Sequence, residues 1–128
     1  TGQRPMEELR PICTSGDILR LQQEVDKVFA AREIRVYVSA IAAATRKSGA
    51  LQLGVSTRGA ISLLRAGQAC ALLDGRDFVK PEDVQKMAEP VLAHRLVLSP
   101  EARMRSMTAQ RILNNVMGSV QVPVRVKQ

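Results

Sequence analysis

The 128-residue chain has the length of one domain that can bury a modest core. Hydrophobic residues make up 45% of it and charged residues 24%, which is ordinary globular composition and excludes wholesale disorder. Arg or Lys interrupts the apolar stretches well before the ~20 residues that a membrane span requires, so we expect a soluble domain. Aromatic residues make up only 2%, which argues against a base-stacking platform for single-stranded nucleic acid.

The net charge of +7 is unevenly distributed. Residues 1–32 hold five basic and five acidic side chains, whereas the remaining residues hold fourteen basic and seven acidic ones. The excess after Arg32 indicates an anionic partner such as a nucleic acid, a nucleotide or an acidic protein face. The alternative is a basic lobe that is balanced by an acidic one in another subunit or domain.

Residues that carry most enzyme chemistry are scarce. The chain has one histidine, His94, and two cysteines, Cys13 and Cys70, which form neither a catalytic set nor a metal site. It contains no GxxxxGK phosphate loop and no GxGxxG motif. Cys70 is expected to be a small buried hydrophobe, and the cysteine usage favours a reducing cytoplasm. We therefore do not expect this chain to be catalytic by itself.

The first part of the chain predicts an arm followed by two helices. Residues 1–13 are polar and contain two prolines, as in a linker. A helix is expected from Thr14 or Ser15 to Ala30 or Ala31. Its apolar residues recur at three- and four-residue steps: Ile18, Leu21, Val25 and Val28. A second helix is expected over 32–46, and residues 51–55 are expected to be a loop. The inner face of this second helix is predicted to hold Ile34, Tyr37, Val38, Ile41 and Thr45.

A third helix is predicted from Thr57 to Leu73, with Ser56 as its N-cap. Its small residues imply that another helix packs closely against it. The predicted packing face comprises Ala60, Leu64, Gly67 and Ala71, flanked by Ile61, Leu63 and Cys70.

The last third of the chain predicts a turn, two more helices and extended pieces. Residues 74–76 are predicted to form a turn with a salt bridge, and residues 77–80 an extended segment. Pro81 can open a helix, which Pro90 should kink or restart. At its expected end His94 and Arg95 favour carbonyl capping or packing over a functional role. Residues 96–107 look irregular, 108–117 helical, and 120–126 an extended tail. The predicted fold is therefore all-α, a small helical bundle with short extended segments.

One local feature suggests a ligand. Residues 54–59, GVSTRG, place Arg58 in the first turn of a helix, where a cation opposes the helix dipole at a cost of roughly 0.3–1 kcal/mol. The free amides of the same turn attract anions, and a guanidinium binds phosphate oxygens with two parallel hydrogen bonds. An arginine there is well placed to meet a phosphate, although an ordinary exposed arginine is the simpler alternative.

Several motifs in order resemble the C-terminal helical lid of MoxR-type AAA+ ATPases. They are GVSTRG (54–59), ISLLRAGQACALLDGRDFV (61–79), KPEDV (80–84) and VLAHRLVL (91–98). The upstream helices, including a tyrosine and the closing Thr45-Arg46, and the ending TAQRILNNVMGSVQVP (108–123) fit as well. The resemblance covers nearly the whole chain. It implies that residues 1–13 are the linker from an AAA+ core and that 14–128 are the lid.

The resemblance also implies a role for the start of the third helix. Arg58 matches the family's sensor-2 arginine, which contacts the γ-phosphate of ATP and couples hydrolysis to lid movement. Arg58, Ser56 and Thr57 would form the lid's share of the ATP site, with no metal ligand. ATP and Mg²⁺ would be held by the core, so that none is expected to bind this chain alone. Arg58 could act on its own subunit's nucleotide or on a neighbour's.

Three positions depart from the family pattern. Thr57 stands where the family usually has Pro, which makes the helix start less rigid but keeps the arginine in place. Lys80 stands where a Thr cap is common, and Val55 occupies a usually small position. These departures affect local stability and leave the expected chemistry intact.

The implied partners are the core of the same protein, neighbouring subunits of a hexameric ring and a von Willebrand A-domain protein. The implied setting is the cytoplasm of a bacterium or archaeon, where such ATPases act as chaperone-like machines that mature proteins or metal-cofactor complexes. The alternative is a stand-alone basic helical module that binds nucleic acid or serves as an adaptor. We do not expect nucleic-acid binding, because the third helix is rich in Ala, Gly and Leu and lacks a polar recognition face.

Overall fold

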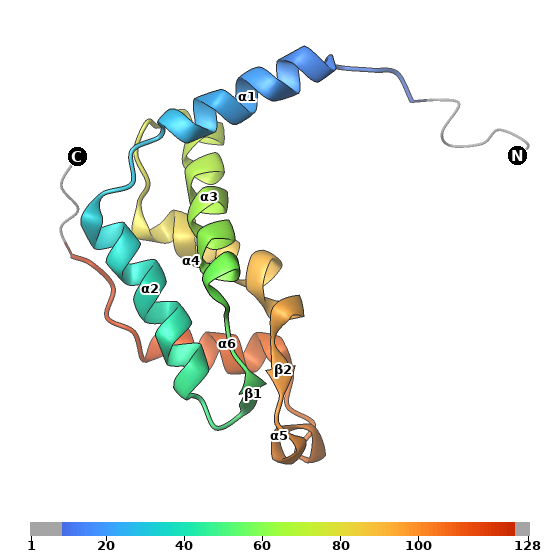
Figure 1. Ribbon diagram of the computed structural model, residues 1–128, viewed down its shortest axis with the longest axis vertical. Coiled ribbons are helices and arrows are strands. Elements are labelled where there is room, and N and C mark those ends of the chain that lie inside the picture. Colours follow the sequence, from blue (N-terminus) through green and yellow to red (C-terminus); the bar gives the residue numbers. More distant parts are fainter. Residues whose placement is uncertain (1–8, 125–128) are drawn as a thin grey trace, which may run out of the picture.

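The computed structural model describes residues 9–124, and Figure 1 shows their arrangement. Six α-helices, one short 3₁₀ helix and two short strands make up this part of the chain. In chain order they are α1 (Ser15–Lys27), α2 (Arg32–Lys47), β1 (Leu51–Leu53), α3 (Thr57–Leu73), α4 (Pro81–Leu92), the 3₁₀ helix (Ala93–Arg95), β2 (Val97–Leu98), α5 (Pro100–Met104) and α6 (Ala109–Gly118). The predicted all-α class is confirmed. None of the described helices is long and apolar enough to cross a membrane.

The core lies between α2, α3, α4 and α6. All five residues predicted for the inner face of α2 are buried, and so are Ile112, Leu113 and Val116 of α6. Leu63 of α3 and Leu92 of α4 complete the centre of this core. Helical spacing of apolar residues was therefore a sound guide wherever a helix has partners on one side.

Helices α3 and α4 form the tightest pair, as the small residues of α3 predicted. A methyl group added to Gly67 would lie 3.5 Å from the side chain of Val79 and 3.7 Å from that of Val84. The buried line of α3 is Gly59, Leu63, Gly67 and Ala71. The buried face of α3 is therefore rotated slightly from the predicted one, since Ala60 and Leu64 are only partly buried and Ile61 is exposed.

Helix α1 corrects the prediction for the first apolar face. Its start is as predicted, with Thr14 and Asp17 capping each other. It buries none of its residues, however, and Ile18 and Leu21 are 44% and 51% exposed. Figure 1 shows why: α1 (blue) reaches away from the other elements and meets them mainly near its end. A helical stripe needs a covering partner to become buried, and the described residues supply little of one.

The first helix also ends earlier than predicted, at Lys27 instead of Ala30 or Ala31. The amide of Phe29 donates to the carbonyl of Asp77 at 2.8 Å, and the carbonyl of Phe29 accepts from the amide of Val79 at 2.9 Å. These bonds to a distant segment use the groups that would otherwise continue the helix. Val28 is buried, as predicted, but in the connection that follows α1.

Residues 51–55 are not a simple loop as predicted, because 51–53 form β1. Strand β1 pairs antiparallel with β2, with Leu51 opposite Leu98 and Leu53 opposite Val97. A pair this short leaves no period-2 pattern that sequence inspection can detect. The pairing ties the connection between α2 and α3 to the segment after α4.

Helix α4 runs through Pro90 to Leu92 before it tightens into the 3₁₀ helix, so of the predicted kink or restart at Pro90 the restart does not occur. The predicted irregular stretch 96–107 contains β2 and α5. Residues 119–124 form no regular element. The rest of the predicted tail, like residues 1–8 of the predicted linker, lies outside the described residues.

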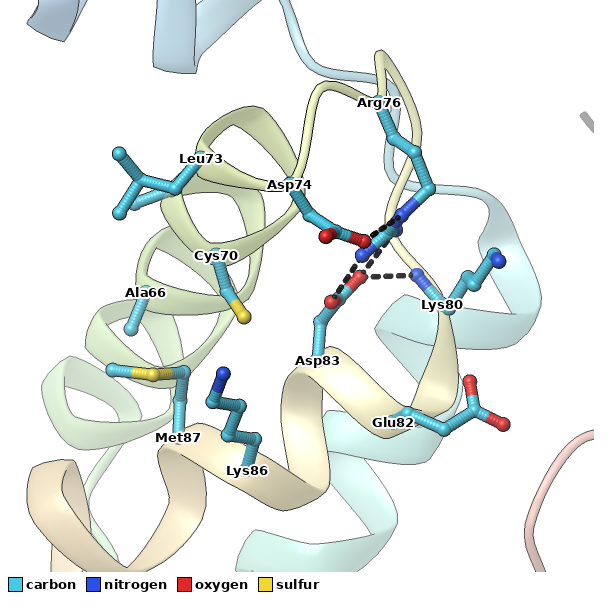
Figure 2. A pocket seen from close by; sticks show the side chains of 11 residues that line it. Ala66, Cys70, Leu73, Asp74, Arg76, Lys80, Glu82, Asp83, Lys86 and Met87 are labelled. Carbon is cyan, nitrogen blue, oxygen red and sulfur yellow. Dashed lines mark hydrogen bonds and ion pairs between the residues drawn. The ribbon is translucent and has the colours of Figure 1, made fainter.

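An ion pair between the half-buried Arg76 and the buried Asp83 joins the turn after α3 to the start of α4 (Figure 2). Arg76 donates two hydrogen bonds to the carboxylate of Asp83, at 2.6 and 2.8 Å, and the amide of Lys80 donates a third at 2.7 Å. The Asp83 side chain is only 5% exposed. The predicted turn with a salt bridge is confirmed, since Gly75 has φ +77° and Arg76 also pairs with Asp74 at 3.0 Å.

This ion pair makes stability depend on acid pH. Burial raises the pKa of the Asp83 carboxyl, but hydrogen bonds from Arg76 and Lys80 outweigh burial and leave the pKa below its usual value. A carboxyl whose pKa is lowered by folding stabilises the fold above its unfolded pKa, and this stabilisation is lost as pH falls through the folded pKa. Measured by urea unfolding, the free energy of unfolding should fall more between pH 7 and pH 3 in the wild type than in Asp83→Asn. Equal decreases in the two proteins would contradict a lowered pKa for Asp83.

Candidate functional site

The start of α3 is a capped helix terminus with two free amides. Ser56 accepts a hydrogen bond from the amide of Gly59 at 3.1 Å, as predicted for an N-cap. No described residue accepts from the amides of Thr57 and Arg58, which occupy the first two helical positions. Ser56, Thr57 and Arg58 are all exposed. The three predicted site residues therefore lie together on one accessible helix end.

Arg58 has no ion-pair partner among the described residues. The carboxylates that form ion pairs there serve Arg20, Lys27, Arg65 and Arg76 instead. A guanidinium in the first turn of a helix without a carboxylate beside it retains its full capacity for an external anion.

Two residues that sequence reasoning did not assign to the site hold the segment before α3. The amide of Val55 donates to the hydroxyl of Thr45 at 2.9 Å, and the carbonyl of Val55 accepts from Nε of Arg46 at 2.9 Å. Both belong to the last turn of α2. The only sequence signal for them was that the motif Thr45-Arg46 closes the second helix.

Gly54 allows this close approach of two backbone segments. A methyl group at Gly54 would lie 2.7 Å from the amide nitrogen of Arg46 and 2.8 Å from both the carbonyl carbon and the hydroxyl of Thr45. Contacts this short with backbone atoms exclude any side chain. A glycine at this position is therefore required by packing.

A second arginine lies beside the first turn of α3. Cδ of Arg95 is 3.7 Å from the position that a methyl group on Gly59 would take, and Arg95 has no ion-pair partner among the described residues. The carbonyl capping considered for His94 and Arg95 is not seen in the described part of the chain, whereas packing of the Arg95 stem is. The 3₁₀ helix thus brings another basic residue to the same end of α3.

A hollow in the surface lies elsewhere. It has a volume of about 970 Å³ between α3 and α4, and Figure 2 shows Cys70, Lys86 and Met87 on its wall. Cys70 is twelve residues along α3 from Arg58, which corresponds to roughly 18 Å at 1.5 Å per residue. Burial and the nearby Asp83 carboxylate raise the pKa of the half-buried Cys70 thiol. The Cys70 thiol is therefore not activated as a nucleophile. Because of the distance along α3, the hollow is also separate from the start of that helix.

Comparison with known proteins shows to which family the chain belongs. Residues 43–116 match the family model described as the AAA lid domain, which covers more than half of the chain. The chain is 43% identical over 121 residues to the protein YeaC of Bacillus subtilis and 32% identical over 125 residues to the chaperone MoxR1 of Mycobacterium tuberculosis. These alignments cover 94% and 91% of the chain but only 38% and 33% of those relatives. The chain thus spans about a third of their length.

The fold comparison agrees. A crystal structure of a protein from Cytophaga hutchinsonii, provisionally named an ATPase, superposes on 84% of this chain with a TM-score of 0.80 and 29% sequence identity. This chain covers 36% of that protein. A shorter match of 55% identity over 47 residues links it to protein MoxR of Paracoccus denitrificans. Family model, relatives and fold all agree that this chain belongs to the AAA lid domain family and is a helical lid of the MoxR type.

Proposed function

We propose that this chain is the sensor-2 lid of an ATP-hydrolysing AAA+ machine, and that Arg58 contacts the phosphates of ATP held by the core. The observation that carries this proposal is an exposed arginine, without a carboxylate partner in the described residues, at the capped start of α3. Ser56 and Thr57 lie at the same terminus and contribute polar groups beside it.

The chemistry of phosphoryl transfer explains why an arginine belongs there. Charge is spread over the oxygens of the transferred phosphoryl group, and catalysis depends on positioning and on electrostatic stabilisation. The planar guanidinium of an arginine donates to two phosphate oxygens at once. The free amides of Thr57 and Arg58 add partial positive charge in the same direction.

The remaining parts of the site are assigned to the rest of the protein. The printed sequence contains no phosphate loop, and the chain spans 38% and 33% of YeaC and MoxR1. On this proposal an AAA+ core holds ATP and Mg²⁺, and the chain alone is expected neither to hydrolyse ATP nor to bind it tightly. A lid that touches the phosphates lets hydrolysis change the angle between lid and core.

The cellular role is proposed by analogy with a relative. One of them is named a chaperone, and we propose the same class of work for this protein: remodelling of client proteins or metal-cofactor complexes in the cytoplasm. A hexameric ring and a von Willebrand A-domain partner complete this proposal.

The proposal is tested by substituting Arg58 in the full-length protein that contains this chain. Arg58→Ala should lower the ATPase kcat about tenfold or more, since it removes a charged donor from the transferring phosphate. Arg58→Lys should recover only part of the loss, because an ammonium lacks the planar pair of donors.

Arg65→Ala is the matched control. Arg65 is also an exposed arginine of α3, its side chain being 56% exposed, but it pairs with Asp26 and lies two turns further along the helix. Its removal should leave kcat unchanged. Normal turnover in Arg58→Ala, or equal losses in both variants, would refute the sensor-2 role.

A further inference from the structure

We propose that Thr45 and Arg46 are positioning residues for Arg58, because together they fix both backbone polar groups of Val55, three residues before it. This inference rests on the proposed function of Arg58 and extends it into α2. The last turn of α2 would then position Arg58, a role that the stability of α2 itself does not require.

Thr45 is suited to this task by its buried hydroxyl. The side chain is fully buried, its hydroxyl donates to the carbonyl of Ala42 at 2.7 Å, and the same oxygen accepts from the amide of Val55 at 2.9 Å. The first bond sets the rotation of the hydroxyl and aims its lone pair at Val55. A hydroxyl on a helix can make both bonds at once, whereas a valine of the same shape can make neither.

Arg46, which is exposed, forms the second hydrogen bond to the backbone of Val55. Its Nε donates to the carbonyl of Val55 at 2.9 Å, so that the peptide groups on both sides of this residue are bound to consecutive residues of α2. Val55 itself is only 2% exposed. Two hydrogen bonds and a buried side chain leave this residue one orientation relative to α2.

Close contacts carry this orientation into α3. Gly54 packs directly on the backbone of α2, and Cγ1 of Val55 lies 3.1 Å from the position of a methyl group on Gly59. Ser56 then caps the helix in which Arg58 is the second residue. Gly54, Val55 and Ser56 are thus each held by a close contact or a hydrogen bond, so a shift of Val55 should displace the start of α3 and Arg58 with it. Displacements of about 1 Å can cost a reaction 10²-fold.

A double-mutant cycle in the full-length protein separates positioning from general support of the fold. The four proteins are wild type, Thr45→Val, Arg58→Ala and the double variant, with the kcat of ATP hydrolysis as the readout. Thr45→Val should lower kcat about threefold to tenfold, and should add nothing in the Arg58→Ala background, because its effect passes through Arg58. Thr45→Ser, which keeps the hydroxyl, should restore kcat to near the wild-type value.

Arg46→Met keeps the inference testable if Thr45→Val fails to fold. Arg46 is exposed, so this change removes the hydrogen bond to Val55 and retains the aliphatic stem. It too should lower kcat in the wild-type background and not in Arg58→Ala. Lys47→Met is its matched control, since Lys47 is an exposed neighbour at the same helix end and makes no side-chain hydrogen bond to a described residue.

The outcomes separate the two proposals. If Arg58→Ala lowers kcat while Thr45→Val and Arg46→Met do not, the positioning role is overturned and the sensor-2 role stands. Equal losses in the presence and absence of Arg58 would likewise overturn it, as would an effect of Lys47→Met that matches Arg46→Met. If Arg58→Ala has normal turnover, the proposed function fails first and the positioning role fails with it.

Discussion

Asp83→Ala should lower the free energy of unfolding of this domain by about 2–3 kcal/mol, because it leaves the half-buried Arg76 without its principal partner. The Arg76 side chain is 16% exposed, and Asp83 accepts two of its hydrogen bonds. Removing one member of a buried pair forfeits the attraction but keeps the desolvation cost of the other. Domains of this size have a total stability of roughly 5–15 kcal/mol, so this variant should lose a substantial share of it.

Asp74→Ala is the matched control for this prediction. Asp74 pairs with the same guanidinium at 3.0 Å, but its side chain is 72% exposed. Exposed pairs contribute about 0–1 kcal/mol, so the midpoint of urea unfolding should barely move. Comparable losses in the two variants would show that burial of the Asp83 pair does not determine its contribution.

Gly54→Ala should cost about 3 kcal/mol, since one added methyl group collides with the backbone of α2. The carbonyl carbon of Thr45 and the amide nitrogen of Arg46 cannot move aside as a side-chain terminus can. Relief requires the connection to separate from α2, and the bond between Val55 and the Thr45 hydroxyl then lengthens or breaks. Urea unfolding gives the stability, and amide NMR shifts at Val55 and Arg58 report the displacement.

Gly49→Ala provides the comparison. Gly49 lies in the same connection, nothing approaches within 4 Å of an added methyl group, and its φ is not positive. That substitution should be neutral or stabilising by a few tenths of a kcal/mol through the unfolded chain. A Gly54→Ala variant as stable as Gly49→Ala would contradict the close packing of 54 on α2.

The candidate site was predictable to the extent that it is local. Ser56, Thr57 and Arg58 are consecutive, and the rules for an N-cap and a helix dipole apply without knowledge of any neighbour. Arg95 and Thr45 reach the same helix end from 37 residues after Arg58 and 13 residues before it. No spacing rule connects such positions, because their proximity is created by the packing of α2 and of the 3₁₀ helix around α3.

The same distinction explains the errors in the fold. The inner face of α2 was predicted correctly, since that helix has partners along its length, whereas the apolar face of α1 was assigned to a core that the described residues do not provide. Strand β1 was missed because its partner β2 lies over forty residues later and each strand is very short. The early end of α1 depends on hydrogen bonds from Phe29 to residues 77 and 79.

By itself the sequence determined the helical class and the starts of α1 and α3 with their N-caps, since these rest on residues that are adjacent or one helical turn apart. It also carried the resemblance to MoxR-type lids, which rests on several motifs in the same order. Only the tertiary structure revealed how Val55 is held by Thr45 and Arg46, how Asp83 is buried beside Arg76, and why Gly54 must be a glycine. These features arise where distant segments meet, and their energies depend on burial and on distances of a few tenths of an ångström, which a linear pattern does not encode.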